Sequence, residues 1–316
     1  MIIFALEASC DDTSVAVFKD DKWIFFETIT QTSHAKHGGV ILSDAVKEHI
    51  INLQKLIFKV IKELNLKEID YFAYSSFEGL EPCLIFSKTI ALTFKYLFNC
   101  KIIPINHLYA HAFIPFFDHK ATNFFPFVGI VLSGANSVGY YFQDFENPIK
   151  IVEKNDNPIG HVFDRVGNKL KLPYPSGKTM ECLAIKGKKE FQFTFPKTID
   201  YFSFSGFLSQ SYRIIEREQN LNIYNFCYSF QEEIFQYTIK ILKNVLLLKK
   251  LGKNKVKYLT IGGGVACNKF LQNLCLKNFS NCLFAKDNHC TDNALMIGYL
   301  ARLIISNASE KEKNER

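Results

Sequence analysis

Two histidines, His107 and His111, lie four residues apart in the segment Ile-Asn-His-Leu-Tyr-Ala-His-Ala-Phe. On a helix this spacing places both imidazoles on one face, one turn apart, so that they can reach the same metal ion. Imidazole is a good ligand for zinc and for iron. Such a site needs at least one more ligand, and the best distant candidate is Asp292, in the segment Cys-Thr-Asp-Asn-Ala. The alternative is that the histidines are ordinary core or surface residues, because so short a motif often occurs without a metal.

A second group of polar side chains follows the apolar run of residues 2–6, where residues 7–14 read Glu-Ala-Ser-Cys-Asp-Asp-Thr-Ser. The carboxylates of Asp11 and Asp12, with hydroxyls and turn amides at the same edge, can hold the phosphates of a nucleotide and its bound cation. The plainer alternative is a polar hairpin turn.

Two turns of small residues could bring backbone close to a ligand. Residues 133–137 read Ser-Gly-Ala-Asn-Ser, and residues 262–268 read Gly-Gly-Gly-Val-Ala-Cys-Asn. A glycine cluster between a strand and a helix lets backbone amides approach a ligand closely. A tight strand-to-helix turn has the same requirement, so the pattern fits either interpretation.

The elements that must position these residues alternate between strand and helix. In the first third, strands are expected at 2–6, 15–18, 23–29, 71–74 and 102–105, with helices at about 43–64, at 84–98 and through the two histidines. The second half repeats the plan, with strands at 127–132, 138–142 and 258–261, a long helix at 230–251 and a last helix capped by Thr291-Asp292. This order predicts an α/β fold of two similar lobes with a nucleotide site in a cleft between them, and the resemblance described below adds a metal to that cleft.

Composition sets broad limits. The chain has 316 residues, and its 38 basic and 31 acidic side chains give a formal charge of +7, which permits a nucleic-acid partner without requiring one. Nine scattered cysteines without a Cys-x-x-Cys pair fit a reducing cytoplasm. The apolar start is followed at once by acidic residues, unlike a signal peptide, and no apolar run reaches the roughly 20 residues of a membrane span.

Eight motifs in order resemble the TsaD family, also called Gcp or YgjD, over nearly the whole chain. The motifs start at Glu7 (Glu-Ala-Ser-Cys-Asp-Asp-Thr), His37 (His-Gly-Gly-Val), His107 (the histidine pair), Phe163 (Phe-Asp), Tyr174 (Tyr-Pro-Ser-Gly), Phe202 (Phe-Ser-Phe-Ser-Gly), Gly263 (Gly-Gly-Val-Ala-Cys-Asn) and Cys290 (Cys-Thr-Asp-Asn-Ala).

The resemblance implies the actin-like (RNase H-like) ATPase fold and a cytoplasmic transferase that acts on tRNA. The family moves a threonylcarbamoyl group from threonylcarbamoyl-AMP to N6 of the adenosine adjacent to the anticodon in tRNAs that read ANN codons, forming t6A and releasing AMP. The implied partners are a paralogous actin-like protein of the TsaB type and a small P-loop ATPase of the TsaE type. By this resemblance, residues 1–104 form the N-terminal lobe, completed by a helix at 292–308, residues 105–291 form the C-terminal lobe, and residues 309–316 form a disordered tail.

The matching positions also imply roles for individual residues. One divalent metal ion, iron(II) or alternatively zinc, would be held by His107, His111 and Asp292. We assign catalysis to Asp11 and Asp12. The adenylate would be bound by Val131, Leu132, Ser133, Gly134, Ala135, Asp164, Gly177, Glu181 and Asn268.

The chain departs from the family pattern at several of these places. Ala135 and Asn136 replace a glycine and a histidine, Ser176 replaces a glycine, and His161 replaces a carboxylate. These changes keep open a non-catalytic paralogue that serves as a scaffold, and an actin-like fold is also compatible with a small-molecule kinase. A metalloprotease is excluded, because Leu108 stands where the glutamate base of His-Glu-x-x-His belongs.

Overall fold

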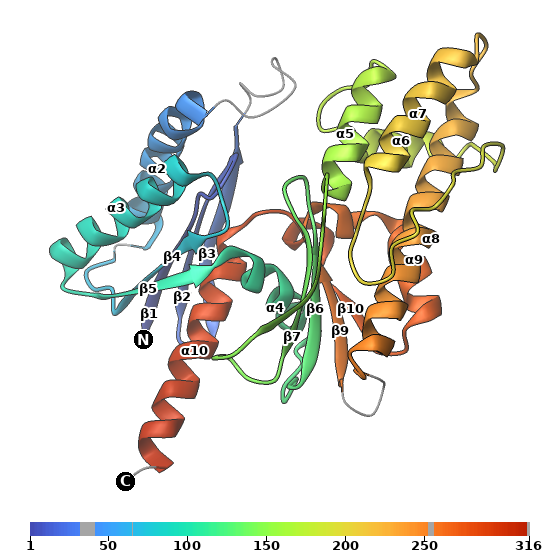
Figure 1. Ribbon diagram of the computed structural model, residues 1–316. Helices are drawn as coiled ribbons and strands as arrows, with labels where there is room; N and C mark the ends of the chain where they lie inside the picture. The colour runs from blue at the N-terminus through green and yellow to red at the C-terminus, as the bar shows by residue number, and fades with distance from the viewer. Residues whose placement is uncertain (32–41, 65, 252–255, 315–316) are drawn as a thin grey trace. The chain divides into compact units, whose positions relative to one another are not determined.

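The computed structural model describes residues 1–31, 42–64, 66–251 and 256–314 (Figure 1). The chain divides into two compact units, one formed by Met1–Phe117 with Thr291–Arg316 and the other by Asp118–Cys290. The sequence placed the start of the second lobe at residue 105, whereas the structure keeps residues 105–117 in the first unit. The motif at His37–Val40 lies outside the described residues.

The first unit is built on a five-stranded sheet of order β3-β2-β1-β4-β5. The strands are β1 (Ile2–Glu7), β2 (Asp12–Lys19), β3 (Lys22–Thr30), β4 (Tyr71–Phe77) and β5 (Lys101–Asn106). β1, β2 and β3 pair antiparallel, while β4 pairs parallel with β1 and with β5. The predicted order of three strands, helix, strand, helix, strand is confirmed.

Helices cover both faces of this sheet. They are α2 (Leu42–Leu64), α3 (Glu81–Phe98) and α10 (Ala294–Asn314), while α4 (His107–His119) follows β5 directly. α2 and α3 lie on one face and α10 on the other (Figure 1). Gly298 lets α10 approach closely, because a Cβ there would come within 2.3 Å of the Phe18 ring. α10 continues to Asn314, through part of the segment that the sequence predicted to be disordered.

The second unit repeats the plan around a sheet of order β10-β9-β6-β7-β8. Its strands are β6 (Phe127–Leu132), β7 (Ser137–Phe142), β8 (Ile149–Glu153), β9 (Tyr258–Gly262) and β10 (Cys282–Phe284). Its helices are α5 (Ile159–Lys169), α6 (Gly177–Ala184), α7 (Ser205–Arg217), α8 (Ile223–Leu248) and α9 (Lys269–Asn278), with 3₁₀ turns η1 (Gly264–Cys267) and η2 (Asp287–His289). β6, β7 and β8 are antiparallel, and β9 is parallel to β6 and β10, so the predicted two-lobe α/β class is confirmed.

Some element boundaries differ from the sequence prediction for local reasons. α8 begins at Ile223 rather than 230, because the Asn222 side chain accepts hydrogen bonds from the N–H groups of Tyr224 and Asn225. α3 begins at Glu81 with Pro82 in its first turn, where the missing N–H has no helical partner to lose.

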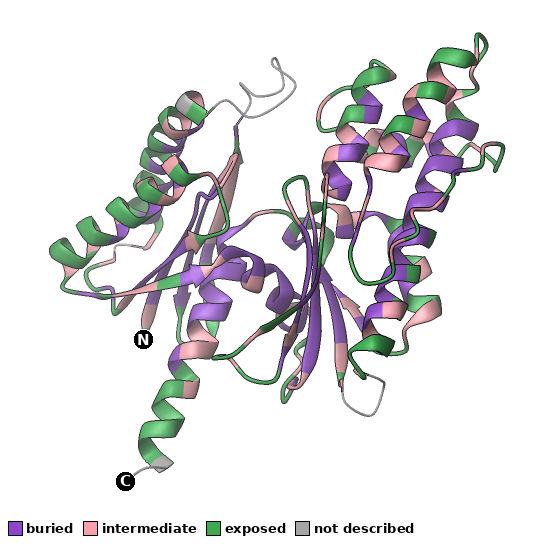
Figure 2. Ribbon diagram, viewed as in Figure 1, coloured by how far each residue is buried: buried purple, intermediate pink, exposed green. Residues whose placement is uncertain are grey.

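In each unit the central strands (β1, β2 and β4; β6, β7 and β9) are largely buried, and the helices turn exposed faces outward (Figure 2). Alternate residues of the first sheet point to its two faces. On the face that α3 covers, the rings of Phe4 and Phe72 stack with their centroids 5.2 Å apart. Among the described residues, none of the helices combines the length and apolar content that a membrane span requires.

Candidate functional site

The histidine pair begins a helix directly after a strand. β5 ends at Asn106, whose side-chain oxygen accepts hydrogen bonds from the backbone N–H groups of Leu108 and Tyr109 at 2.9 and 3.1 Å. This cap starts α4 at His107 and places His107 and His111 on one helix face. Both histidines are buried, with ring centroids 4.6 Å apart and planes at 89°.

The carboxylate of Asp292 lies beside both imidazoles. Its Oδ1 is 2.9 Å from Nε2 of His111 and 3.6 Å from Nε2 of His107. Each of the three residues offers a ligand atom, and these atoms lie within 4.8 Å of one another. The structure thus brings together three residues that are far apart in sequence.

Asp292 does not cap the last helix, so that prediction is wrong. The cap is Asn293, whose Oδ1 accepts a hydrogen bond from Met296 N at 3.1 Å. The first N–H of α10, on Ala294, donates instead to the hydroxyl of Ser14 in β2 at 2.9 Å. The Asp292 carboxylate instead faces the histidines.

His107 is oriented by residues at the end of β1. Its Nδ1 is 3.1 Å from Oε2 of Glu7 and 3.1 Å from the hydroxyl of Ser9, while Ser9 N donates to Oε1 of Glu7 at 2.7 Å. Since a carboxylate only accepts, Nδ1 of His107 carries a proton. A carboxylate behind a histidine is a common second layer of metal sites, which fixes the ring and its tautomer.

Charge in this cluster is balanced by burial and by close partners. Burial opposes a charge on His107, but the carboxylates of Glu7 and Asp292 outweigh it and raise its pKa to about 9. Burial likewise opposes the charge on Asp292, and the two histidines outweigh it and lower its pKa to about 2. Burial lowers the pKa of His111, which favours the neutral imidazole that a metal needs.

The residues present fit a divalent metal ion. Two imidazoles and one carboxylate form the ligand set of many open iron(II) and zinc sites. Nε2 of His111 and Nε2 of His107 both face the same carboxylate oxygen of Asp292, so the three ligand atoms converge on one place. Among the described residues, Nδ1 of His111 has no hydrogen-bond partner, so the ring of His107 is oriented by a neighbouring carboxylate and that of His111 is not.

The two predicted catalytic carboxylates lie near this group. Asp11, Asp12 and Asp292 also offer oxygen atoms within 4.8 Å of one another. Asp12 begins β2, and its Oδ1 accepts a hydrogen bond from the Thr30 hydroxyl at 2.5 Å. Burial, followed by the charge of Asp292, raises the pKa of Asp12 to about 7.

The residues expected to bind the adenylate all belong to the second unit. Two of them, Val131 and Leu132, are buried in β6. The rest lie on the turn after β6, on α5, on α6 and at the start of α9: Ser133, Gly134, Ala135, Asp164, Gly177, Glu181 and Asn268.

The turn after β6 is tight and open on its outer side. Ser133 N donates to Asn136 O at 2.7 Å, and the Ser133 hydroxyl accepts from Asn136 N at 2.9 Å. Gly134 and Ala135 are exposed, and a Cβ on Gly134 would meet nothing within 4 Å. The N–H of Gly160, in α5, donates to Ser133 O at 3.1 Å, so the first turn of α5 packs directly on this turn.

The carboxylates of this unit hold neighbouring segments in place. Asp164 Oδ1 accepts from Ser176 N at 2.8 Å, immediately before Gly177 opens α6. Glu181 is buried, and its Oε1 accepts from Lys269 N at 2.6 Å at the start of α9. These contacts connect α5, α6 and α9.

Asn268 and the glycine triplet shape the start of α9. Asn268 Oδ1 accepts from Leu271 N at 3.1 Å, and its amide N–H donates to Gln231 Oε1 at 2.7 Å. Gly263 has φ of 88°, and a Cβ there would come within 2.5 Å of Leu132 O. Glycine is therefore required at position 263 for the close approach of this turn to β6.

Sequence reasoning assigned no role to Glu7, Ser9 or Gln231. Glu7 and Ser9 stand in the motif before Asp11. Two polar residues at the end of a buried strand are the sequence feature that could have indicated their role. Gln231 could not be found in this way, because it lies inside a long amphipathic helix.

Comparison with known proteins identifies the family of the chain. The profile of the TsaD family, described as tRNA N6-adenosine threonylcarbamoyltransferase, matches residues 24–299. Relatives with that name include proteins of Mycoplasma mobile, 36% identical over 98% of this chain and all of the relative, and of Mycoplasmoides gallisepticum, 34% identical over 96% of this chain and 98% of the relative.

Solved structures of the actin-like class share the fold. HypF of T.kodakarensis has a TM-score of 0.63 at 14% identity, over 97% of this chain and 48% of that one. Component A of the (R)-2-hydroxyglutaryl-CoA dehydratase of Acidaminococcus fermentans has a TM-score of 0.56 at 11% identity, over 94% and 96%. The similarity to these two solved structures establishes the fold. The family profile matches most of the residues that the structural comparison covers. The chain belongs to the TsaD family of tRNA N6-adenosine threonylcarbamoyltransferases.

Proposed function

We propose that this chain transfers a threonylcarbamoyl group from threonylcarbamoyl-AMP to N6 of the adenosine adjacent to the anticodon of tRNA, forming t6A. Membership of the family makes it a transferase that acts on tRNA, and the names of its relatives do not favour the kinase or scaffold alternatives. The observation that carries the proposal is the buried group of His107, His111 and Asp292, with Glu7 behind His107. A drifted scaffold has no need to keep an oriented metal-binding set.

In this proposal the second unit binds the AMP part of the donor. The exposed turn at Gly134 and Ala135 brings the backbone within reach of phosphate oxygens, and Gly177 opens α6 with space where a side chain would stand. Asp164, Glu181 and Asn268 keep these segments in register through their contacts with Ser176, Lys269 and Gln231. Binding would then use preformed turns.

The first unit supplies the metal-binding residues and two carboxylates. His107, His111 and Asp292 would hold one iron(II) ion, or zinc, which when bound acts as a Lewis acid for the carbamoyl oxygen. In the transfer, N6 forms a bond to the carbamoyl carbon, the bond from that carbon to the AMP oxygen breaks, and N6 loses a proton. Asp11 and Asp12, whose oxygens lie within 4.8 Å of Asp292, are the proposed acceptors of this proton.

Removal of both imidazoles tests the proposal. His107→Ala with His111→Ala should abolish the metal content measured by plasma mass spectrometry and the t6A formed on an unmodified tRNA transcript. His119→Ala is the matched control, because His119 is an exposed histidine on the same helix. Retention of metal and transfer by the double variant would overturn the assignment.

The proposal extends to cellular context. We expect a cytoplasmic enzyme that works with a paralogous actin-like protein of the TsaB type and a small P-loop ATPase of the TsaE type. Addition of the two purified partners should raise the number of transfer turnovers per chain.

A further inference from the structure

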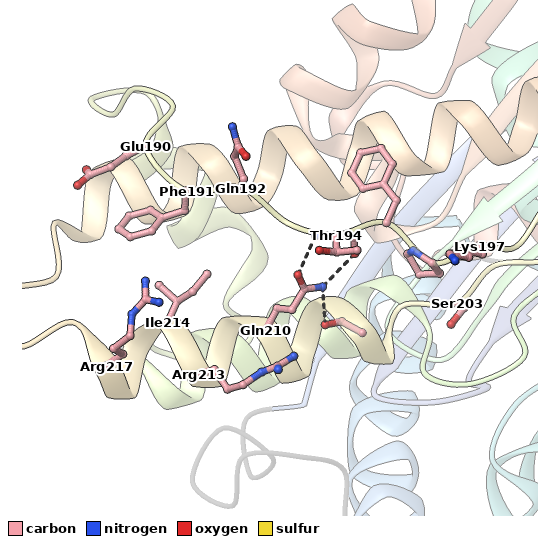
Figure 3. A pocket seen from close by; sticks show the side chains of 13 residues that line it. Glu190, Phe191, Gln192, Thr194, Lys197, Ser203, Gln210, Arg213, Ile214 and Arg217 are labelled. Atoms are coloured by element: carbon pink, nitrogen blue, oxygen red, sulfur yellow. Dashed lines mark hydrogen bonds between the residues drawn. The ribbon is translucent and has the colours of Figure 1, made fainter.

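A groove in the second unit runs between α7 and the segment of residues 190–197 (Figure 3). Its volume is about 930 Å³. Its lining includes three basic side chains, Lys197, Arg213 and Arg217, and one acidic side chain, Glu190. Arg217 and Glu190 lie toward one end, and Lys197 lies toward the other (Figure 3).

The walls of the groove are fixed by hydrogen bonds. The Gln210 side chain, on α7, accepts from Thr194 N at 2.7 Å and donates to Thr194 O at 3.0 Å. The other side is tied to α8, since Ser229 Oγ accepts from Glu190 N at 2.9 Å and from Phe191 N at 3.1 Å. A groove held at both walls exists before a ligand arrives, which lowers the entropy cost of binding.

The basic side chains are available to an anion. Arg213 is exposed, and its Nε donates only weakly, to Ser209 O at 3.3 Å. Within the described ranges, neither Arg213 nor Lys197 forms an ion pair. Arg217 pairs with Glu218 at 2.9 Å, but its side chain is 76% exposed, so this pair is weak and exchangeable. Glu190, the opposing charge, already accepts from Asn225 Nδ2 at 2.7 Å.

The helix that forms one wall of the groove also contacts a helix of the proposed adenylate site through its other face. α7 packs on α5, where the Tyr212 hydroxyl donates to Arg165 O at 3.3 Å and Lys169 pairs with Glu216 at 2.6 Å. α5 carries Asp164 and contacts the turn at Ser133. A ligand in the groove would therefore lie on the same group of helices as the donor segments.

We propose that Lys197, Arg213 and Arg217 bind the phosphodiester backbone of the tRNA substrate in this groove. The inference rests on the proposed function, which requires a tRNA. Arg213 and Arg217 are four residues apart, so both guanidinium groups follow one side of α7 and can contact successive parts of one strand. Phosphate contacts position a nucleic acid without reading its sequence, which suits an enzyme that acts on several tRNAs.

The test is the salt dependence of binding of a fluorescent tRNA transcript to the full chain. Each phosphate contact contributes a slope of about −0.7 to −0.9 to the plot of log affinity against log salt. Arg213→Ala should make the slope less steep by about 1 and weaken tRNA binding roughly tenfold at 0.1 M salt. Lys197→Ala with Arg213→Ala should make the slope less steep by about 2. Arg213→Lys, which keeps the charge, should restore most of the slope.

Lys240→Ala with Lys277→Ala is the matched control, because it removes two exposed charges from helices that do not line the groove. It should leave the slope unchanged. The His107 and His111 double variant should bind tRNA as the wild type does while losing transfer, so binding and chemistry fail separately. If the Arg213 and Lys197 variants keep the wild-type slope and affinity for tRNA, the inference is overturned even if transfer occurs. Binding of small phosphate compounds in the groove without binding of tRNA there would also overturn it. Absence of transfer by the wild type with its partners would instead count against the proposed function.

Discussion

Replacement of Glu7 by Gln should weaken metal binding without removing a ligand. Glu7 is fully buried and accepts two hydrogen bonds, one on each oxygen, from Nδ1–H of His107 and from Ser9 N. A Gln side chain has nearly the same shape but only one acceptor atom. In either orientation its NH₂ group faces an N–H donor, so one of the two hydrogen bonds is lost.

The magnitude follows from the bond that is lost. A hydrogen bond to a charged group contributes about 1.5–3 kcal/mol, and loss of a second-layer partner commonly weakens metal binding about 10- to 100-fold. Because the Ser9 hydroxyl also lies 3.1 Å from Nδ1 of His107, it can hold part of the ring orientation, and we expect the lower part of this range, about 10- to 30-fold.

Competition with a chromophoric chelator at fixed pH measures this affinity. Glu153→Gln is the control, since Glu153 is an exposed glutamate of the second unit that pairs with the exposed Lys150. Ser9→Ala should weaken binding by less than Glu7→Gln, because it leaves the carboxylate in place. A metal affinity of Glu7→Gln within twofold of wild type, with the thermal midpoint retained, would refute the role of Glu7 as the orienting partner.

Three further outcomes follow from the structure. Gly263→Ala should lower stability by about 2 kcal/mol or more, seen as a lower thermal midpoint, because φ of 88° and the 2.5 Å approach to Leu132 O both exclude a side chain; an unchanged midpoint would contradict this. His49→Ala should lower the free energy of unfolding by about 2–3 kcal/mol and reduce transfer, as denaturant unfolding with the exposed His119→Ala as control would measure. The reason is that Nε2–H of buried His49 donates to Cys10 O at 2.9 Å and its Nδ1 accepts from the Thr13 hydroxyl at 2.8 Å, which fixes the segment that carries Asp11. Chelation should lower the thermal midpoint of the wild type but not of His107→Ala, because only a metal bound to the folded state stabilises it; equal shifts in both would show that the chelator acts elsewhere.

Sequence reasoning was most successful where burial alone decides structure. The strands around Phe4 and Phe127 are continuous apolar runs, and such runs have few alternatives between polar turns. The spacing of His107 and His111 also sufficed to place them on one helix face.

The features that the sequence could not predict depend on contacts between distant segments. The sequence could not reveal that Asn293, rather than its neighbour Asp292, caps α10, because both residues are good caps and the histidines decide between them. Nor could it assign Asp164, Glu181 and Asn268 to hydrogen bonds within the protein, since those partners lie on other helices.

The position of Asp292 has a consequence for synthesis of the chain. His111 leaves the ribosome 181 residues before Asp292, so the nascent first unit carries two histidines without their carboxylate until the whole second unit has been made. The sheet face around Phe18, on which Gly298 packs, also stays uncovered by α10 during this interval. On the proposed assignment, the complete three-ligand set forms only in chains whose translation has passed Asp292.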